Sequence, residues 1–339
     1  MPFIRRPSHA LLGIVLAAQA LPAAAAPPHY PVEIENCGTA LRFDAPPANV
    51  VTIGQSVTET LYALGLGARM AGTSLWFNDV LPEFKPQDER VPRLNNNAPS
   101  FESVVNKRPG LVATQFEWMI GKQGVVGTRE QFAGLGIPAY IMPDDCEGKN
   151  NLVGADGTRI ASYAIESLYK GVTQLAAIFD QDAAGAALVA DLRAREAASV
   201  RRIEALKLPD ISAVFWFSSA DTALDPYVAG ARGIPGFMMK TLGLRNVVRS
   251  DEEWPTVGWE TIARANPSVL VIARMDRRRF PADDYVNKLA FLRADPVTRE
   301  MEAVKRGRIV ILDAHAMQSS LRMVGGLETL AEAIAKLDQ

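Results

Sequence analysis

The stretch TRIASYAIESLYKGVTQLAAIFD, residues 158–180, predicts one long apolar helix set between two similar halves of the chain. Asp156 and Thr158 are candidate N-cap residues in front of it. We interpret it as a rigid connection between two lobes, and the alternative is an ordinary buried helix within one domain. Its apolar residues recur at spacings of three and four in two neighbouring stripes, which suit packing on both sides: Ile160, Ala164, Leu168, Val172, Leu175 and Phe179, with Ala161, Ile165, Tyr169 and Ala176 beside them.

The segments on either side of this helix share a pattern. Phe101 precedes Glu102 in the first half, and Trp259 precedes Glu260 in the second. A proline follows each Glu, at 109 and at 267, and a strand-like apolar run follows each proline, at residues 111–113 and 269–272. This weak internal repeat predicts two lobes of like design.

Length and composition agree with two lobes. A chain of 339 residues exceeds the usual size of one domain, and its 48% hydrophobic and 22% charged residues are typical of a folded globular protein. We expect an N-terminal lobe over residues 26–157, the connecting helix over 158–180 and a C-terminal lobe over 181–339. No run beyond the N-terminal region is apolar for long enough to span a bilayer.

Residues 1–25 are typical of a cleavable secretory signal peptide. Arg5 and Arg6 precede an apolar run at residues 11–20 and small residues at 23–26, and we expect cleavage after Ala25. Cys37 lies too far downstream to become a lipid-modified N-terminus. The mature protein is therefore expected free in an exported space, most simply a bacterial periplasm.

Both cysteines, Cys37 and Cys146, lie in the first half of the chain. In an oxidising compartment they are expected to form a disulfide, the alternative being two separately buried thiols. The signal peptide carries two positive charges, so its removal changes the formal net charge from −2 to −4. A mildly acidic chain without a basic block argues against nucleic acid and anionic membranes as partners.

Strand-like runs alternate with helical patterns, which predicts parallel sheets flanked by helices. A hairpin is expected at residues 32–36 and 41–43, and long helices at residues 183–206 and 326–337. The expected strands of the first lobe are residues 50–53, 69–73, 110–114 and 137–141, and those of the second are 211–217, 246–248, 269–273 and 308–312.

Ligands of open parallel sheets bind beyond the carboxyl ends of the strands, so the residues that follow each strand are candidate ligand contacts. Aromatic side chains there suit a ligand with large flat faces, although each can also pack within its lobe. The candidates are Gln55, Ser56, Trp76, Phe77, Gln115, Phe116 and Trp118 in the first lobe, and Ser218, Tyr227, Arg274, Arg277 and His315 in the second.

Arg274 and Arg277 belong to the only dense basic cluster, whose guanidinium groups suit an anionic chelate. A metal bound directly by the protein is not expected, because only His315 of the three histidines can face a cleft between the lobes. The sequence contains no Gly-x-Ser-x-Gly, phosphate-binding glycine loop or His-Glu-x-x-His motif of an enzyme.

Taken in order, these features resemble the class III periplasmic solute-binding proteins of ABC importers, which take up ferric siderophores, haem and cobalamin. The resemblance rests on Ile34-Glu35-Asn36-Cys37-Gly38, the strand at residues 50–51 leading to Thr58-Glu59, the two Glu-to-Pro repeats and the connecting helix. It implies two α/β lobes joined by one rigid helix, with the ligand in the cleft between them. It also implies that Glu102 and Glu260 dock on arginines of the membrane permease.

The resemblance implies a carrier of a ferric siderophore-type chelate, with haem or cobalamin as alternative ligands, no cofactor and a monomeric state. Two other classes of function stay open on the sequence. One is a secreted two-lobed enzyme that uses Glu117 and Asp276 as paired carboxylates. The other is a ligand-sensing co-receptor that signals instead of feeding a permease.

Overall fold

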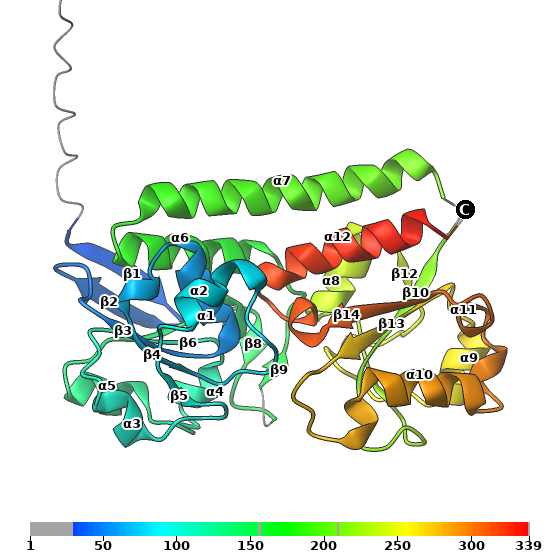
Figure 1. Ribbon diagram of the computed structural model, residues 1–339, viewed down its shortest axis with the longest axis horizontal. Coiled ribbons are helices and arrows are strands. Elements are labelled where there is room, and N and C mark those ends of the chain that lie inside the picture. Colours follow the sequence, from blue (N-terminus) through cyan, green and yellow to red (C-terminus); the bar gives the residue numbers. More distant parts are fainter. Residues whose placement is uncertain (1–29, 155–156, 209, 338–339) are drawn as a thin grey trace, which may run out of the picture.

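The computed structural model describes residues 30–154, 157–208 and 210–337, which form two α/β lobes side by side beneath a long helix (Figure 1). The predicted signal peptide and the candidate N-cap Asp156 lie outside the described residues. Within the described part, no helix is long and apolar enough to cross a membrane.

The N-terminal lobe is built on a five-stranded sheet with strand order β5-β4-β3-β6-β7, in which every pair is parallel. The central strand β3 is fully buried, as expected for a strand covered on both faces. The strands are β3 (Val50–Ile53), β4 (Met70–Ser74), β5 (Arg93–Asn95), β6 (Val112–Thr114) and β7 (Ala139–Ile141). The helices are α1 (Gln55–Ala63), α2 (Lys85–Asp88), α3 (Phe101–Val105), α4 (Glu117–Ile120) and α5 (Arg129–Gly134).

The C-terminal lobe repeats this plan around the parallel strands β10, β13 and β14. A short parallel strand β12 and an antiparallel strand β11 extend the sheet beside β10. The strands are β10 (Ser212–Ser218), β11 (Tyr227–Val228), β12 (Arg245–Asn246), β13 (Val269–Arg274) and β14 (Ile309–Asp313). The helices are α8 (Ile234–Thr241), α9 (Trp259–Ala265), α10 (Tyr285–Ala294), α11 (Glu302–Lys305) and α12 (Leu321–Ala335).

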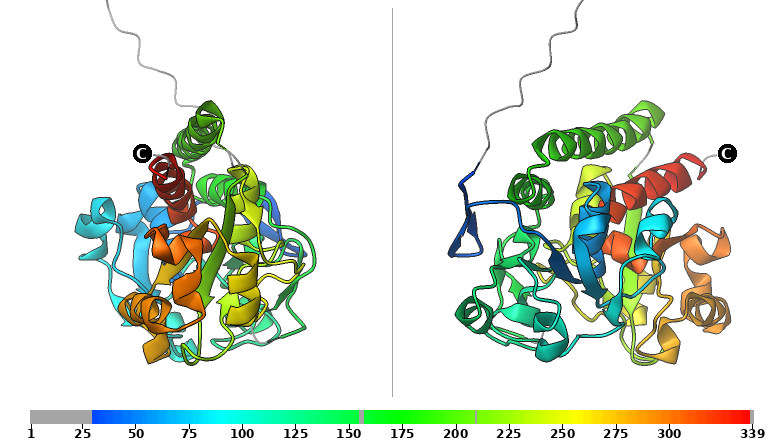
Figure 2. Two further views of the ribbon diagram at one scale, coloured as in Figure 1. Left: turned by 90° about the vertical axis from the view of Figure 1, so that its right-hand side faces the viewer. Right: turned by 60° about the vertical axis from the view of Figure 1, so that its left-hand side comes forward.

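Helix α7 (Asp182–Leu206) lies over both lobes (Figures 1 and 2). It packs on α6 (Glu166–Ile178) at the N-terminal lobe and on α12 at the C-terminal lobe. The two helices α6 and α7 approach closely at Gly185, where an added Cβ would lie 2.4 Å from the Cβ of Ala176. Glycine at this position therefore allows the helices to pack.

The predicted helix over residues 158–180 is wrong at its start, because α6 begins only at Glu166. Residues Thr158–Arg159 form the short strand β9, which pairs with β8 (Lys149–Asn150). The backbone N–H of Tyr163 donates to the carbonyl of Arg232 in the other lobe at 2.8 Å. These contacts hold the first eight residues of the predicted helix in a non-helical path, and Ile160 is exposed.

The N-terminal hairpin of β1 (Val32–Asn36) and β2 (Thr39–Phe43) is attached to the free edge of β7. The side-chain amide of Asn36 exchanges two hydrogen bonds with the backbone of Ile141, at 2.7 and 2.9 Å, as a neighbouring strand would. The Cys37–Cys146 disulfide lies beside this contact, with Cα atoms 5.7 Å apart. The predicted disulfide is confirmed.

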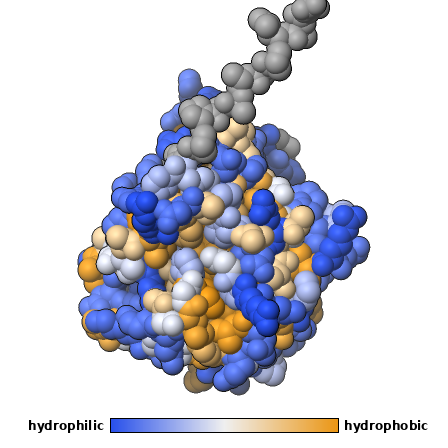
Figure 3. Space-filling view, turned by 90° about the vertical axis from the view of Figure 1, so that its left-hand side faces the viewer, coloured by the Kyte–Doolittle hydropathy of each residue, from blue (hydrophilic) through white to orange (hydrophobic). Residues whose placement is uncertain are grey.

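Figure 3 shows the end of the molecule that carries the N-terminal lobe. Hydrophilic residues cover most of this face, and hydrophobic side chains gather over its lower part, on the side away from α7. In Figure 1, helices α3 and α5 lie on that lower side of the lobe.

Candidate functional site

The carboxyl ends of the two parallel sheets meet where the lobes touch. Ser56, after β3, donates its hydroxyl to the carbonyl of Ser319 at 2.9 Å, and the amide of Gln115, after β6, donates to Gln318 at 3.2 Å. We call this contact the seam and define it by Ser56, Phe77, Asn78 and Gln115 of the N-terminal lobe and Asp276, Arg277, Asp313, His315 and Ser319 of the C-terminal lobe.

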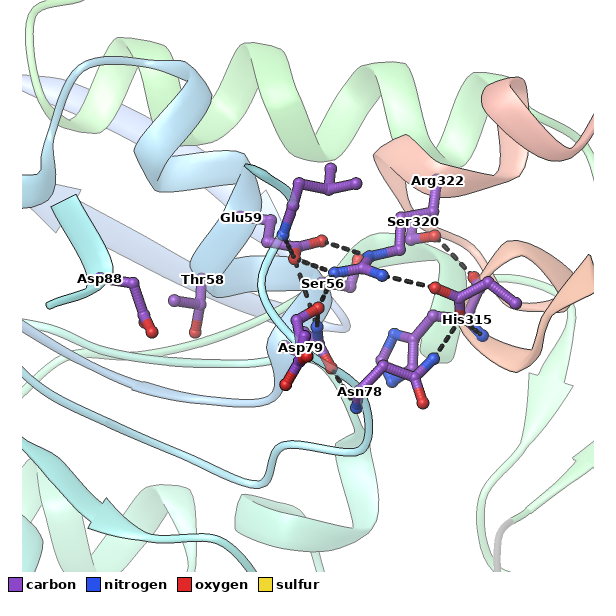
Figure 4. A network of polar contacts seen from close by, with 12 residues as sticks. Ser56, Thr58, Glu59, Asn78, Asp79, Asp88, His315, Ser320 and Arg322 are labelled. Carbon is purple, nitrogen blue, oxygen red and sulfur yellow. Dashed lines mark hydrogen bonds and ion pairs between the residues drawn. The ribbon is translucent and has the colours of Figure 1, made fainter. Parts of the chain in front are cut away.

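A buried ion pair crosses beside the seam (Figure 4). The guanidinium of Arg322 on α12 donates two hydrogen bonds to the carboxylate of Glu59 on α1, from Nε to Oε2 at 2.9 Å and from Nη2 to Oε1 at 2.5 Å. The same guanidinium donates to Asp313 and to the carbonyl of Asp79, each at 2.5 Å. Glu59 is 1% exposed, so the pair is shielded from water and joins the lobes firmly.

Burial by itself would lower the pKa of Arg322, but its hydrogen bonds to Glu59 and Asp313 outweigh burial and raise that pKa. The guanidinium therefore keeps its charge in this site. The sequence analysis did not assign a role to this pair, because the two residues lie 263 positions apart and no short motif connects them.

A second set of contacts joins the lobes at the end of β7. Arg159 lies 3.4 Å from Glu253 of the other lobe, and the hydroxyls of Tyr163 and Ser319 are 2.9 Å apart. Beneath them, Asp144 is buried and its Oδ1 has no partner among the described residues. Burial, followed by repulsion from Asp145, raises the pKa of Asp144 to about 7.

Three polar side chains that were predicted to contact a ligand form hydrogen bonds within the protein instead. Gln55 is buried, and its side chain contacts Glu59 and the backbone of the loop after β4. The carbonyl oxygen of the Gln115 side chain accepts the backbone N–H of Ser56 at 3.0 Å. In this arrangement Gln55, Ser56 and Gln115 shape the seam and do not offer free polar atoms to a ligand.

Trp76, predicted as a ligand contact, is buried instead. It is 2% exposed, its Nε1 donates to Thr73 at 3.0 Å, and the guanidinium of Arg93 lies 3.9 Å from its ring. Its ring is therefore part of the N-terminal core in this structure. Phe77, the next residue, is partly exposed and faces the seam against His315.

Two half-buried aromatic pairs occur at strand ends, one in each lobe. Phe116 stacks on Trp118 after β6, with ring centroids 5.7 Å apart. Phe217 lies against Trp254 at the end of β10, with centroids 4.6 Å apart. The sequence analysis missed Phe217 and Trp254 as candidate contacts, although Phe217 directly precedes the predicted Ser218 in the chain. Such pairs offer flat apolar surfaces at both sheets.

The arginines of the basic cluster that follows β13 have different partners. Arg277 is an interlobe residue, since its guanidinium donates to the carbonyls of Trp76 and Asn96 and to the side chain of Asn97. Arg278 pairs with Asp284 at 2.5 Å. Arg274 is exposed and its Nε lies 3.9 Å from Oδ1 of Asp276, so its guanidinium is accessible from solvent.

Buried polar groups bind the end of β10, next to the strand that carries Arg274. The hydroxyl of Ser218 donates to Asp283 at 2.7 Å, and Lys288 donates to the carbonyl of Phe217 at 2.5 Å. Burial lowers the pKa of Lys288 to about 8, with Asp283 acting in the opposite direction. Tyr227 on β11 is 44% exposed and contributes to the open surface of this lobe.

His315 lies in the seam and is 1% exposed. Its ring centroid is 5.4 Å from that of Phe77, and neither ring nitrogen has a hydrogen-bond partner among the described residues. Burial lowers the pKa of His315 to about 4, Asp313 acts to raise it, and Arg322 lowers it further. The imidazole is therefore neutral at pH 7.

Glu102 and Glu260 occupy equivalent positions, as the internal repeat predicted. Each is the second residue of its helix, α3 or α9, and each side chain is exposed. The aromatic residue before each Glu is anchored: Phe101 packs on Phe132 at 4.9 Å, and Trp259 packs on Trp216 at 4.7 Å. Each lobe thus presents an exposed glutamate at the same position of a helix whose first residue is packed in the core.

A cavity of about 540 Å³ lies on the other side of the Glu59–Arg322 pair, between α1, α7, β14 and α12. Its lining includes Leu81, Phe84, Leu188 and Ile311. None of the predicted ligand residues lines it. Among the described residues, no cluster of three or more His, Cys, Asp or Glu is placed to hold a metal ion.

Comparison with known proteins gives a family match over most of the chain. A family model described as periplasmic binding protein matches residues 50–316, which include both sheets. A curated relative, an uncharacterized ABC transporter substrate-binding lipoprotein of Bacillus subtilis strain 168, is 22% identical over 307 residues, or 90% of this chain and 86% of the relative.

Solved structures share the fold. A periplasmic binding protein of Veillonella parvula superposes with a TM-score of 0.72 at 23% identity, covering 90% of this chain and 97% of that one. An ABC-type Fe3+-hydroxamate transport system of Saccharomonospora viridis superposes with a TM-score of 0.70 at 22% identity, covering 90% and 99%. At these identities the likeness establishes the two-lobed fold.

Proposed function

This chain belongs to the periplasmic binding protein family, and from that membership we propose that it is the substrate-binding component of an ABC importer that captures a ferric siderophore-type chelate. The observation that carries the proposal is the family match over both lobes, whose strand ends meet at the seam. The family is one of binding proteins, so the enzyme alternative with Glu117 and Asp276 is not kept.

The aromatic and basic side chains beside the seam suit one class of ligand. The pairs Phe116–Trp118 and Phe217–Trp254 offer flat apolar faces, and Arg274 offers a positive charge. An iron chelate with planar binding groups and a negative charge would fit both. The ferric hydroxamate transport system that shares the fold supports the same class.

Of the predicted ligand residues, Phe116, Trp118, Ser218, Tyr227 and Arg274 stay in the proposal as contacts. Phe77 and His315 are proposed to lie at the floor of the site. The place of action is the periplasm, and the signal peptide at residues 1–25, which lies outside the described residues, would direct the chain there. The two lobes expected from the sequence, residues 26–157 and 181–339, stay part of the proposal, with the helix between them beginning at Glu166.

Delivery is proposed to use Glu102 and Glu260. One exposed carboxylate on each lobe gives a two-point contact with basic groups of a permease, and the spacing of the two points changes when the lobes move. The co-receptor alternative predicts that these residues do not matter for uptake.

Uptake of a radioactive ferric chelate tests this directly, in cells whose own copy of the chain has been deleted. The native chain should restore uptake, and the double variant Glu102→Gln/Glu260→Gln should not, although it binds the chelate normally. Glu83→Gln, which changes an exposed acid of the short helix η2 (Pro82–Phe84), is the control and should restore uptake fully. Full uptake by the double variant would favour the co-receptor.

A further inference from the structure

Strand β14 forms one edge of the sheet in the C-terminal lobe and runs below α12 in Figure 1. Within the described residues its strand neighbour is β13 alone. The backbone N–H of Leu270 donates to the carbonyl of Arg308 at 3.0 Å, and in such a parallel ladder alternate residues of β14 face β13. The backbone N–H and C=O groups of Ile309 and Ile311 therefore point away from the sheet, and no other described residue forms a hydrogen bond with them.

The other edges of the two five-stranded sheets, as far as the structure describes them, are covered or polar. The side-chain amide of Asn36 pairs with the edge of β7, and Thr256 forms a bridge with Tyr227 on β11. Strands β5 and β12 are 3 and 2 residues long, and each carries an arginine and an asparagine. Such features protect a sheet edge from pairing with another chain. Strand β14 differs, because Ile311 at its centre is 38% exposed.

The cavity of about 540 Å³ under α7 borders this edge, since Ile311 belongs to its lining. The facing walls are Leu81 and Phe84 beside η2 of the N-terminal lobe and Leu188 of α7. We call this space the edge groove. Its volume lies in the range of pockets that bind small ligands. A second folded copy of the chain would have to bring a whole sheet edge between these walls, whereas a single extended segment fits between them.

The edge groove carries an excess of negative charge, because carboxylates outnumber guanidinium groups in its lining. Both arginines of the lining are already bound to acids. Arg195 donates from Nε and Nη2 to Glu328 at 2.8 and 2.7 Å, and Arg322 is bound to the carboxylates described above. Asp191 has only a longer contact, 3.5 Å from Nη1 of Arg195, and its side chain is exposed. A lysine or arginine of an occupant would therefore be favoured here.

We propose that the edge groove binds an extended segment of a partner protein, which adds as a further strand beside β14 and carries apolar residues next to a lysine or arginine. Ile309 and Ile311 each offer one backbone donor and one backbone acceptor to this segment. Its apolar side chains meet Leu81 and Phe84, and its basic side chain meets Asp191. The inference goes beyond the proposed function, because it uses neither the chelate nor the permease contacts.

Fluorescence anisotropy of a labelled peptide, Lys-Val-Thr-Val-Lys with both ends capped, tests this with the mature chain and should show saturable binding. Ile311→Pro removes the outward N–H but keeps the ladder to β13, and it should weaken binding about tenfold or more. Ile311→Ala keeps the N–H and is the matched control, so it should weaken binding less. Absence of saturable binding, or equal effects of the two variants, would overturn the proposal.

The charge is tested with Asp191→Asn, which should weaken binding of the lysine peptide and leave that of Gln-Val-Thr-Val-Gln unchanged. Equal effects on the two peptides would contradict the assigned contact.

A second measurement keeps the test decisive if Ile311→Pro does not fold. In NMR spectra of protein with isotope-labelled isoleucine, the amide signal of Ile311, assigned by its loss in Ile311→Val, should shift when the peptide is added. Its exchange with solvent should also become slower, because the N–H gains an acceptor. An unchanged signal while the peptide binds, or a shift that follows protein concentration alone and so reports a second copy, would overturn the proposal. Neither chelate nor permease is present, so this failure is separate from failure of the proposed function.

Discussion

Arg322 of α12 and Glu59 of α1 form a bidentate ion pair that joins the two lobes, with Nε to Oε2 at 2.9 Å and Nη2 to Oε1 at 2.5 Å. Both side chains are almost fully buried. The pair lies between the seam and the cavity under α7, so it fixes how the lobes sit relative to each other.

Removing one partner of this pair should destabilise the protein strongly. Glu59→Gln leaves the buried guanidinium of Arg322 without its main partner and is expected to cost about 3–5 kcal/mol in the free energy of unfolding. Urea denaturation measures this cost. Glu332→Gln, which breaks the exposed pair with Arg202, is the control and should cost less than about 1 kcal/mol. Equal costs for the two variants would contradict the assigned role of Glu59.

Asp144 should make stability depend on pH. Its folded pKa of about 7 lies above the unfolded value, so it favours the folded state at low pH, and this contribution is lost as the pH rises through 7. We expect Asp144→Asn to gain about 2.5 kcal/mol relative to the native chain between pH 5 and pH 8. Urea denaturation at both pH values provides the measurement, and a variant whose difference from native protein does not change with pH would refute the assignment.

The Cys37–Cys146 disulfide should contribute substantially to stability, because it closes a loop with a sequence separation of 109. For a loop of this length, loss of the bond is expected to cost about 4–5 kcal/mol. Thermal unfolding of Cys37→Ser/Cys146→Ser compared with native protein tests this. A reducing agent should lower the melting temperature of the native chain and leave that of the double variant unchanged.

Two tryptophans should respond differently to truncation. Trp76 is buried in the N-terminal core, so Trp76→Ala should cost about 3–5 kcal/mol of stability. Trp118 is half-buried beside Phe116 at the proposed site, so Trp118→Ala should weaken ligand binding with a smaller effect on stability. Urea denaturation and a ligand titration of both variants separate the two roles, and the reverse pattern would contradict this placement.

Much of the fold could be predicted from the sequence because its signals are local. The run at residues 50–53 is the buried strand β3 with the predicted bounds, and Glu102 and Glu260 occupy the same position of their helices. A strand or a first helical turn is specified by neighbouring residues, so pattern reasoning finds it.

The parts that were missed depend on contacts between distant residues. The start of α6 was misplaced because Tyr163 is bound to Arg232 of the other lobe, which overrides the helical pattern at residues 158–165. The Glu59–Arg322 pair carries no spacing that a sequence motif could reveal. Trp76 follows a strand as predicted, but the burial of its ring is decided by tertiary packing.

Tryptophan fluorescence of the mature protein, titrated with a panel of ferric siderophores, haem and cobalamin, tests the proposed function most directly. One ferric chelate should quench the signal saturably, and Arg274→Ala or Trp118→Ala should weaken its binding. Arg299→Ala, which changes an exposed residue of the short helix η5 (Thr298–Glu300), is the matched control and should bind normally. Saturable binding of haem or cobalamin alone, or of no member of the panel, would contradict the assignment of a ferric chelate as the ligand.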